Sequence, residues 1–281
     1  MRDVPNSLRT DAAGGEGGVA PIIRVVNLHK AFGGPPVLDG VSIDFAPAKT
    51  TVIMGPSGCG KSVTLKHIVG LLKPDSGQVF FDSQRVDQLT ERQWAPIRLQ
   101  IGLLFQMGAL FDSMTVGDNI EFPLIEHTPL SKAERRERVA EALKVVDMAG
   151  AEARMPSQLS GGQRKRVALA RAIVVKPRVV LYDEPTTGLD PIRSDGINEL
   201  IIKLRNTMGV TNIVVTHDLA SARKIADRVV MLLGGKVAAD GSFQSLERSP
   251  DERVQHFLTG TYSRDDDDPV PGAVPARGET T

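Results

Sequence analysis

Short, predominantly apolar runs recur along this chain and are separated by segments with helical spacing. Such runs occur at residues 51–54, 179–182 and 213–216. Runs of this kind are typical of parallel strands that are buried on both faces of a sheet. Further strands are predicted at residues 22–26, 37–45, 78–81, 101–105, 228–233 and 236–239, the last two as a hairpin joined through Gly234 and Gly235.

The segments between these runs contain the pattern of amphipathic helices. Ser131 and Glu134 form a capping-box pattern at the start of a helix predicted at residues 131–148. Four apolar residues then recur on one face at helical spacing, namely Val139, Ala142, Leu143 and Val146. Other helices are predicted at residues 61–72 and 161–175. Strands that alternate with helices predict an α/β layered core, into which a helix-rich subdomain is inserted at about residues 107–166.

The two ends of the chain differ in composition from its middle. Residues 11–20 are rich in glycine and alanine without an apolar period, and the stretch after residue 260 carries four successive aspartates and several prolines. Segments of this kind bury too little apolar surface to fold alone. We therefore expect a flexible tail at residues 1–20, one domain at 21–260, and an acidic, proline-rich tail at 261–281.

Composition narrows the classes of protein to consider. Lysine and arginine together number 34, as do aspartate and glutamate, whereas a dedicated nucleic-acid binder usually carries a basic excess. The single cysteine excludes an intramolecular disulfide and suits a reducing cytosol. Residues 1–21 lack the apolar stretch of a signal peptide, and no apolar run approaches the ~18 residues that a membrane helix needs. Any role at a membrane is therefore expected to come through a partner.

Residues 55–62 match the pattern of a phosphate-binding loop, between a predicted strand and a predicted helix. Glycines let backbone N–H groups turn toward phosphates, and a helix N-terminus favours an anion. Lys61 is predicted to meet the β- and γ-phosphates, and the Ser62 hydroxyl to hold Mg²⁺. The candidate nucleotide-binding residues are Gly55, Pro56, Ser57, Gly58, Cys59, Gly60, Lys61 and Ser62.

Two adjacent carboxylates, Asp183 and Glu184, end the apolar run at residues 179–182. Neighbouring strand residues point to opposite faces, so the two carboxylates can do different work. Asp183 is predicted to hold Mg²⁺ and Glu184 to polarise the attacking water. Phosphoryl transfer depends mainly on the positioning of the reactants and on charge stabilisation, for which one metal ligand and one base suffice.

The pentapeptide Leu-Ser-Gly-Gly-Gln at residues 159–163 opens the helix predicted next. A phosphate loop, this pentapeptide and an apolar strand ending in Asp-Glu, in that order, resemble the ATP-binding-cassette (ABC) ATPases. The resemblance implies a RecA-like P-loop NTPase core with an antiparallel β subdomain and an inserted α-helical signature subdomain. It also implies hydrolysis of ATP in a homodimer. In such a dimer the signature residues of one subunit, Ser160, Gly161, Gly162 and Gln163, would meet the γ-phosphate held by the other.

The resemblance extends over roughly residues 22–260 and implies roles for four more residues. Phe32 matches the aromatic residue that stacks on adenine, although a phenylalanine at a strand end is also compatible with a core position. Gln106 matches the glutamine that touches Mg²⁺ and senses the membrane partner. Asp190 matches the loop that communicates across the dimer, and His217 matches the histidine that contacts the γ-phosphate. Val63 departs mildly from the pattern, because many members have threonine or serine there.

Residues 107–128 and 251–260 resemble, more narrowly, the ATPases of the Mla phospholipid-trafficking system of Gram-negative envelopes. This resemblance implies a subunit at the cytoplasmic face of the inner membrane, with an integral membrane permease, a mammalian-cell-entry-domain periplasmic protein and accessory subunits as partners. The phospholipid would be carried by these partners and not by this chain. No nucleic-acid partner is implied.

Several alternatives stay open at this point. Leu110, Phe111 and Met114 suit either a groove for the permease or the core of the helical subdomain. Cys59 suits either redox control or an incidental small residue. The C-terminal tail either packs on the neighbouring subunit or is disordered. Alternative functions are the ATPase of an importer for a small solute such as an amino acid, an ABC ATPase acting on ribosomes or DNA, and a regulatory module that only binds nucleotide.

Overall fold

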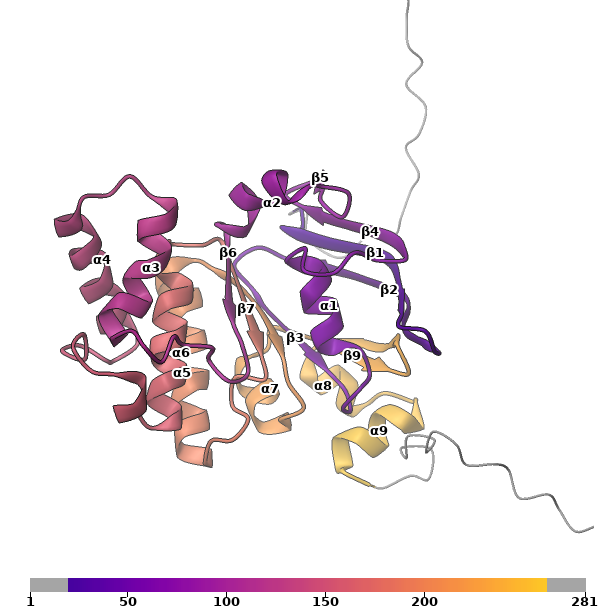
Figure 1. The fold of residues 1–281 in the computed structure, drawn as a ribbon. Coiled ribbons are helices and arrows are strands. Elements are labelled where there is room, and N and C mark those ends of the chain that lie inside the picture. Colours follow the sequence, from indigo (N-terminus) through magenta and orange to yellow (C-terminus); the bar gives the residue numbers. More distant parts are fainter. Residues whose placement is uncertain (1–19, 262–281) are drawn as a thin grey trace, which may run out of the picture.

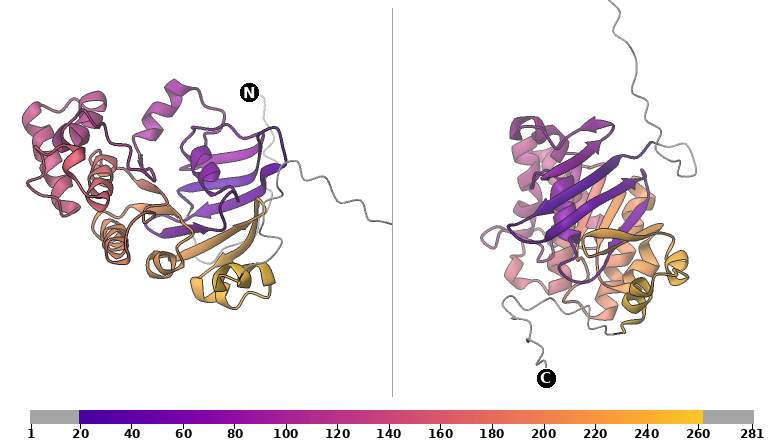
Figure 2. Two further views of the ribbon diagram at one scale, coloured as in Figure 1. Left: turned by 60° about the horizontal axis from the view of Figure 1, so that its bottom comes forward. Right: turned by 90° about the vertical axis from the view of Figure 1, so that its right-hand side faces the viewer.

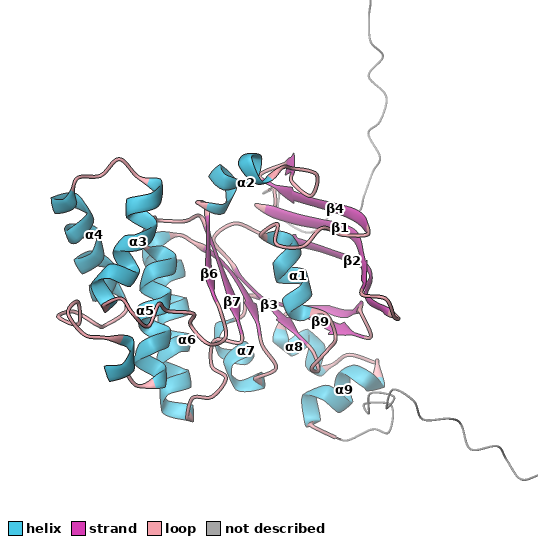
Figure 3. Ribbon diagram, viewed as in Figure 1, coloured by secondary structure: helices cyan, strands magenta, loops and turns pink. Residues whose placement is uncertain are grey.

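A six-stranded sheet forms the centre of the molecule (Figures 1 and 3). The computed structural model describes residues 20–261, so the two predicted tails lie almost entirely outside the described residues. The strand order is β10 (Lys236–Gly241), β9 (Arg228–Leu233), β3 (Thr50–Met54), β8 (Thr211–Val215), β7 (Val179–Asp183) and β6 (Ile101–Leu104). All neighbouring pairs are parallel except β9 with β10, which form the predicted antiparallel hairpin.

Alternate residues of the central strands are buried on opposite faces of this sheet. On β3, Val52 and Met54 belong to one hydrophobic cluster and Ile53 belongs to the other. The same alternation separates Tyr182 from Leu181 on β7. The unbroken apolar runs therefore arise because both faces of the sheet are covered, as predicted.

The second sheet has four antiparallel strands in the order β2–β1–β4–β5. Its strands are β2 (Pro36–Phe45), β1 (Ile23–Ala31), β4 (Ser76–Phe81) and β5 (Gln84–Arg85). Helix α1 (Lys61–Ile68) lies between the two sheets, where its Leu65 and Ile68 join the cluster that the sheets share (Figure 1). This arrangement places the N-terminus of α1 at the end of β3.

Helices cover the other face of the central sheet. Among them, α5 (Gly161–Ile173) and α6 (Pro191–Met208) contact its strands, and α3 (Val116–His127) and α4 (Lys132–Val145) pack on α5. Of these, α3 and α4 project to one end of the molecule (Figure 2, left). Helix α4 begins with the predicted capping box of Ser131 and Glu134, and all four predicted apolar residues of this helix are buried.

Like α3 and α6, the remaining helices were not predicted individually, and they are short. They are α2 (Glu91–Arg98), α7 (Leu219–Ile225), α8 (Phe243–Glu247) and α9 (Glu252–Thr259). The sequence also predicts α1 to residue 72, but it ends at Ile68, before Gly70 at φ +69°. A Cβ atom at Gly70 would lie 2.2 Å from the Trp94 ring, so α2 packs against the chain where α1 stops. Between residues 20 and 261, no helix is both long and apolar enough to span a membrane.

Candidate functional site

The predicted phosphate and hydrolysis residues follow three neighbouring strands of the central sheet. The phosphate loop follows β3, the pair Asp183–Glu184 ends β7, and His217 follows β8. Val215 of β8 pairs with Ile53 of β3 on one side and with Asp183 on the other. Because the strands are parallel, their carboxyl ends meet at one edge of the sheet, and the candidate site lies there.

The phosphate loop is packed tightly against its surroundings. Gly55 has φ +148°, and a Cβ atom there would lie 2.2 Å from the carbonyl oxygen of Leu232. Lys61 is only 7% exposed, and its Nζ donates hydrogen bonds of 2.7 Å to the carbonyl oxygens of Gly55 and Pro56. The lysine ammonium group is thus held against the loop that is predicted to surround the phosphates. A bound phosphate would compete with these two carbonyls for its hydrogen-bonding capacity.

Ser62 and Asp183 are brought together from positions far apart in the sequence. The Ser62 hydroxyl donates a 2.7 Å hydrogen bond to Oδ1 of Asp183. A hydroxyl and a carboxylate oxygen are the hard ligands that Mg²⁺ prefers, usually beside water and nucleotide phosphate oxygens. No group of three or more acidic, histidine or cysteine side chains within residues 20–261 forms a metal cage. The donor set at Ser62 and Asp183 therefore fits an ion that the nucleotide would share.

Gln106 does not join this pair in the structure. It lies on the exposed loop after β6, and no hydrogen bond connects its side chain to Ser62 or Asp183 among the described residues. Its assignment as a Mg²⁺ ligand remains a prediction.

The Glu184 carboxylate is the centre of a hydrogen-bonded group. His217 Nδ1 lies 3.0 Å from Oε1, and the hydroxyls of Thr187 and Thr216 donate to Oε2 over 3.1 and 3.4 Å. The backbone N–H of Glu184 donates to the carbonyl of Val215, at a φ of +50°. A non-glycine residue with positive φ is uncommon and often lies at a functional site. A carboxylate oriented in this way can accept hydrogen bonds from a water molecule, which is what activation of that water requires.

The signature residues are not part of this group within one chain. Ser160 caps α5, where its hydroxyl accepts from the N–H of Gln163 and Gln163 Oε1 accepts from the N–H of Ser160. Helix α5 packs on the opposite face of the sheet from α1. Asp190 caps α6, and its partner Arg193 lies against Gly162. The structure therefore places the signature beside the Asp190 loop and apart from the phosphate loop.

Phe32 is on the surface, as an adenine-stacking residue must be, with 59% of it exposed. The Lys30 ammonium group lies 5.4 Å from the centre of its ring. Asp75 holds this end of β1, because its carboxylate accepts 2.7 Å hydrogen bonds from Lys30 Nζ and from the N–H of Ala31. Sequence reasoning missed Lys30 and Asp75, since no local pattern connects residues so far apart in the chain.

Cys59 is buried, with 7% exposure. Burial raises the pKa of its thiol, although the nearby positive charge of Lys61 acts in the opposite direction. A reactive thiol needs a lowered pKa and solvent access. The structure therefore favours the interpretation of Cys59 as a small packing residue over redox control.

The apolar residues after β6 divide between the surface and the core. Met107 is 85% exposed and Phe111 44% exposed, whereas Leu110 packs against the core of the helical layer. The Phe111 and Phe122 rings pack edge to face, with their centres 5.3 Å apart. The Arg171 guanidinium group lies near the Phe111 ring. Leu110 therefore fits the core interpretation, while a groove for the permease at this segment stays a prediction.

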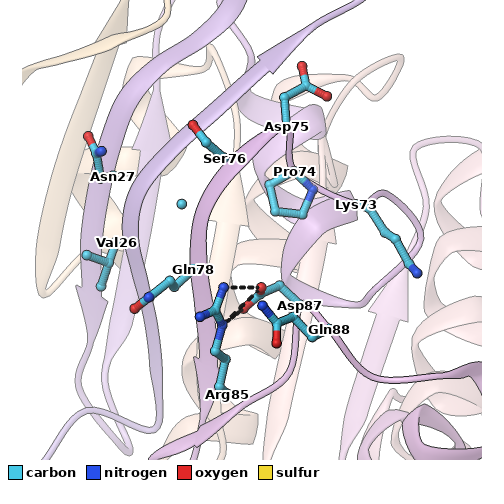
Figure 4. Close-up of a pocket in the computed structure, with 11 residues that line it drawn as sticks. Val26, Asn27, Lys73, Pro74, Asp75, Ser76, Gln78, Arg85, Asp87 and Gln88 are labelled. Carbon is cyan, nitrogen blue, oxygen red and sulfur yellow. Dashed lines mark hydrogen bonds and ion pairs between the residues drawn. The ribbon is translucent and has the colours of Figure 1, made fainter.

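A further hollow lies elsewhere, on the four-stranded sheet. It measures about 780 Å³, and none of the predicted nucleotide or metal residues lines it. Figure 4 shows Arg85 and Asp87 paired within it, and Asp87 also accepts from the N–H of Val79. The charged groups of this pair are satisfied by each other, and Asp75 at the same hollow is paired with Lys30. Lys73 also lines the hollow. A smaller hollow of about 430 Å³ borders the candidate site and includes Thr187 and His217.

Comparison with known proteins agrees with this geometry. A family model described as "ABC transporter" matches residues 38–187. The intermembrane phospholipid transport system ATP-binding protein MlaF of Escherichia coli K12 is 39% identical over 261 residues, which cover 93% of this chain and 96% of MlaF. The probable ribonucleotide transport ATP-binding protein Mkl of Mycobacterium leprae is 40% identical, covering 89% of this chain and 72% of Mkl.

A solved structure is also similar. It is a dimeric, post-hydrolysis state of an ATP-binding cassette bound to ADP and Pi, with a TM-score of 0.73 and 35% identity, covering 79% of this chain and 98% of that one. The chain therefore belongs to the ABC transporter family, as one of its ATP-binding and ATP-hydrolysing subunits.

Proposed function

We propose that this subunit drives phospholipid transport between the inner and outer membranes, from the cytoplasmic face of the inner membrane. The observation that carries the proposal is the similarity to MlaF, which extends over nearly the full length of both chains. It includes residues 107–128, where an ABC ATPase would meet its permease, and so reaches beyond the nucleotide site. Transport of this kind would maintain the lipid asymmetry of the outer membrane.

The chemistry proposed for the site is hydrolysis of ATP. Phe32 stacks on the adenine, while Lys61 and the backbone N–H groups of residues 55–62 bind the phosphates. Ser62, Asp183 and Gln106 would hold Mg²⁺, which would neutralise charge on the phosphate oxygens. Glu184 orients and polarises the attacking water, with its own position set by Thr187, Thr216 and His217.

His217 has a second role in this proposal. Its ring pairs with Glu184 in the structure and is exposed on its other side. From that position it donates a hydrogen bond to the γ-phosphate, where negative charge develops during hydrolysis. Hydrolysis would thus use a base and a charge stabiliser that are already in contact.

A homodimer completes the site in this proposal. Ser160, Gly161 and Gly162 form a helix N-terminus suited to an anion, yet within one chain they lie apart from the phosphate loop. A second subunit would supply these signature residues to the nucleotide. Gln163 would stabilise the helix cap at Ser160, and Asp190 would lie at the boundary between the two nucleotide sites. The similar cassette solved with ADP and Pi is a dimer.

The permease is proposed to dock on the exposed apolar residues after β6. Phe105, Met107 and Phe111 are 40%, 85% and 44% exposed, and Ile125 of α3 is 51% exposed. Large apolar side chains are exposed at protein interfaces, which supports this site for docking. A mammalian-cell-entry-domain protein and accessory subunits would join the assembly through the permease.

The test is affinity purification of the tagged chain from detergent-solubilised native membranes, followed by identification of the bound proteins and lipids. Recovery of a permease, a mammalian-cell-entry-domain protein and phospholipid is the expected result. Met107→Asp should reduce that recovery, whereas the matched control Leu71→Asp, at a separate exposed leucine, should not. Recovery of a permease for small solutes would contradict the proposed phospholipid substrate. Recovery of ribosomes or DNA in place of membrane proteins would contradict the proposed role in transport.

A further inference from the structure

We propose that Lys165 is a positioning residue that holds the backbone of residues 184–187, called here the Glu184 loop, in place. It also couples this loop to the N-terminus of α5, where the signature residues lie. The inference rests on the proposed function in one respect, which is the role of Glu184 in activating water. Neither the phosphate-loop pattern nor the Asp-Glu pair points to Lys165, because it lies on a different element from both.

Lys165 is a buried cation with an unusual set of partners. It is 6% exposed, and its Nζ donates hydrogen bonds of 2.7 Å to the carbonyl oxygens of Pro185 and Thr187. The Glu184 carbonyl lies 3.4 Å from the same nitrogen. An ammonium group has three donors, and all three are directed at one short stretch of backbone. That stretch begins at the proposed catalytic glutamate.

This arrangement is costly for a residue that only fills space. Among the described residues, Lys165 forms no ion pair and is satisfied by backbone carbonyls instead. Burial lowers the pKa of its ammonium group, while the charge of the Glu184 carboxylate opposes that effect. An apolar side chain of the same length would avoid the desolvation cost, so the charge itself points to a role in holding the loop.

The loop needs an external restraint to keep Glu184 in place. Glu184 has φ +50°, in the left-handed region that disfavours a residue with a Cβ atom. Thr187 then turns back so that its hydroxyl donates to Glu184 Oε2 over 3.1 Å. Lys165 binds the carbonyl of this same threonine. The contacts therefore run from Lys165 through Thr187 to the oxygen that would orient water.

Helix α5 connects Lys165 to the signature residues at the N-terminus of the same helix. Ser160 caps the helix and Lys165 follows one and a half turns later, so both belong to one rigid segment. In the proposed dimer, Ser160 and Gly162 meet the nucleotide of the partner subunit. Engagement of that nucleotide would hold α5, and Lys165 would transmit its position to Glu184 of its own chain. Each subunit would thus adjust its own hydrolysis to the nucleotide bound by its partner.

The test compares Lys165→Met, Lys165→Arg and Thr187→Val with the control Lys203→Met. Lys203 also donates to a backbone carbonyl, that of Val145, but it lies away from Glu184. For Lys165→Met we expect kcat to fall about tenfold or more with KM for ATP within about twofold, which is the pattern of a transition-state effect. Lys165→Arg should recover part of kcat, and Lys203→Met should retain wild-type kcat.

A double-mutant cycle separates positioning from general destabilisation. Because Lys165 acts through Thr187, Lys165→Met combined with Thr187→Val should be no slower than Lys165→Met alone. Wild-type kcat in folded Lys165→Met, an equal loss in Lys203→Met, or independent losses in the double variant would overturn the inference. If Lys165→Met does not fold, Thr187→Val provides the test. Wild-type kcat in Thr187→Val would then overturn the inference. Full hydrolysis by Glu184→Gln would instead contradict the proposed function itself.

Discussion

Glu184 and His217 follow different strands and meet through a single 3.0 Å contact. The glutamate is well shielded, with 12% of its side chain exposed, whereas the histidine side chain is 58% exposed. This difference suits two separate tasks. A shielded carboxylate keeps a fixed orientation toward water, and an exposed imidazole remains free to turn toward an incoming phosphate.

Replacement of the two proposed key residues should have distinguishable consequences. Glu184→Gln keeps the shape of the side chain but removes its basicity, so ATP hydrolysis should fall by about a hundredfold or more while ATP still binds. Size-exclusion chromatography with ATP should then detect an accumulated dimer. Lys61→Ala should lose hydrolysis without accumulating that dimer. Turnover at the wild-type rate in either variant would refute the role given to that residue.

Asp75 is expected to influence the proposed adenine contact of Phe32 through Lys30. The hydrogen bond from Lys30 holds the pKa of the Asp75 carboxyl below its usual value, so the carboxylate is charged at neutral pH. Asp75→Asn should loosen Lys30 from the Phe32 ring and raise KM for ATP about two- to fivefold, the size expected for a surface cation–π contact. Asp82→Asn is the matched control, because Asp82 is also exposed and is paired with Arg178. Equal KM values in both variants would contradict this linkage.

At the scale of elements, side-chain caps fix where helices begin near the site. Asp218 accepts from the N–H groups of Ala220 and Ser221 and thereby starts α7 directly after His217. It also accepts from the hydroxyls of Ser221 and Thr186. A short helix of this kind has little stability of its own, so its cap and its packing decide whether it forms.

The cap at Asp218 should make part of the stability depend on pH. Burial alone would raise the pKa of Asp218, but hydrogen bonds from Ser221, Ala220 and Thr186 together hold it below the usual value. A carboxyl with a lowered pKa stabilises the fold above its unfolded pKa, and that contribution is lost as pH falls through the folded pKa. Asp218→Ala should therefore cost about 1–2 kcal/mol in the free energy of unfolding at neutral pH and less below about pH 4.

Denaturant unfolding at a series of pH values measures this effect. The matched control is Ser242→Ala, which removes the uncharged cap of α8. Its cost should stay constant across the same pH range. A pH-independent cost for Asp218→Ala would argue that the carboxylate contributes only as a neutral hydrogen-bond acceptor.

At the scale of the whole molecule, the separation of the signature from the phosphate loop predicts that each site of the proposed dimer is built from two chains. Lys61→Ala and Ser160→Arg should each abolish hydrolysis alone. When they are mixed, the heterodimer has one site with both changes and one site with neither. Activity should return to roughly a quarter of the wild-type rate at equal mixing, if the two sites act independently. No recovery on mixing, with heterodimers verified by pull-down of a second tag, would contradict a shared site.

The sequence by itself determined the features that depend on neighbouring residues. Burial on both faces of β3 and β7 required continuous apolar runs, and these are visible in the chain. The cap of α4 joins Ser131 and Glu134, which are three residues apart, so the local sequence pattern predicted it. The order of the phosphate loop, signature and Asp-Glu pair identified the family, which the comparisons confirmed.

The tertiary structure alone decided which distant residues meet. Asp75 with Lys30, and Lys165 with the Glu184 loop, join positions 45 and about 20 residues apart through packing of separate elements. The early end of α1 likewise follows from the Trp94 ring of α2, which occupies the space beside Gly70. The physical reason is common to all three. A sequence pattern records the local periodicity of burial and capping, whereas these contacts depend on how strands pair and layers pack, which no single segment encodes.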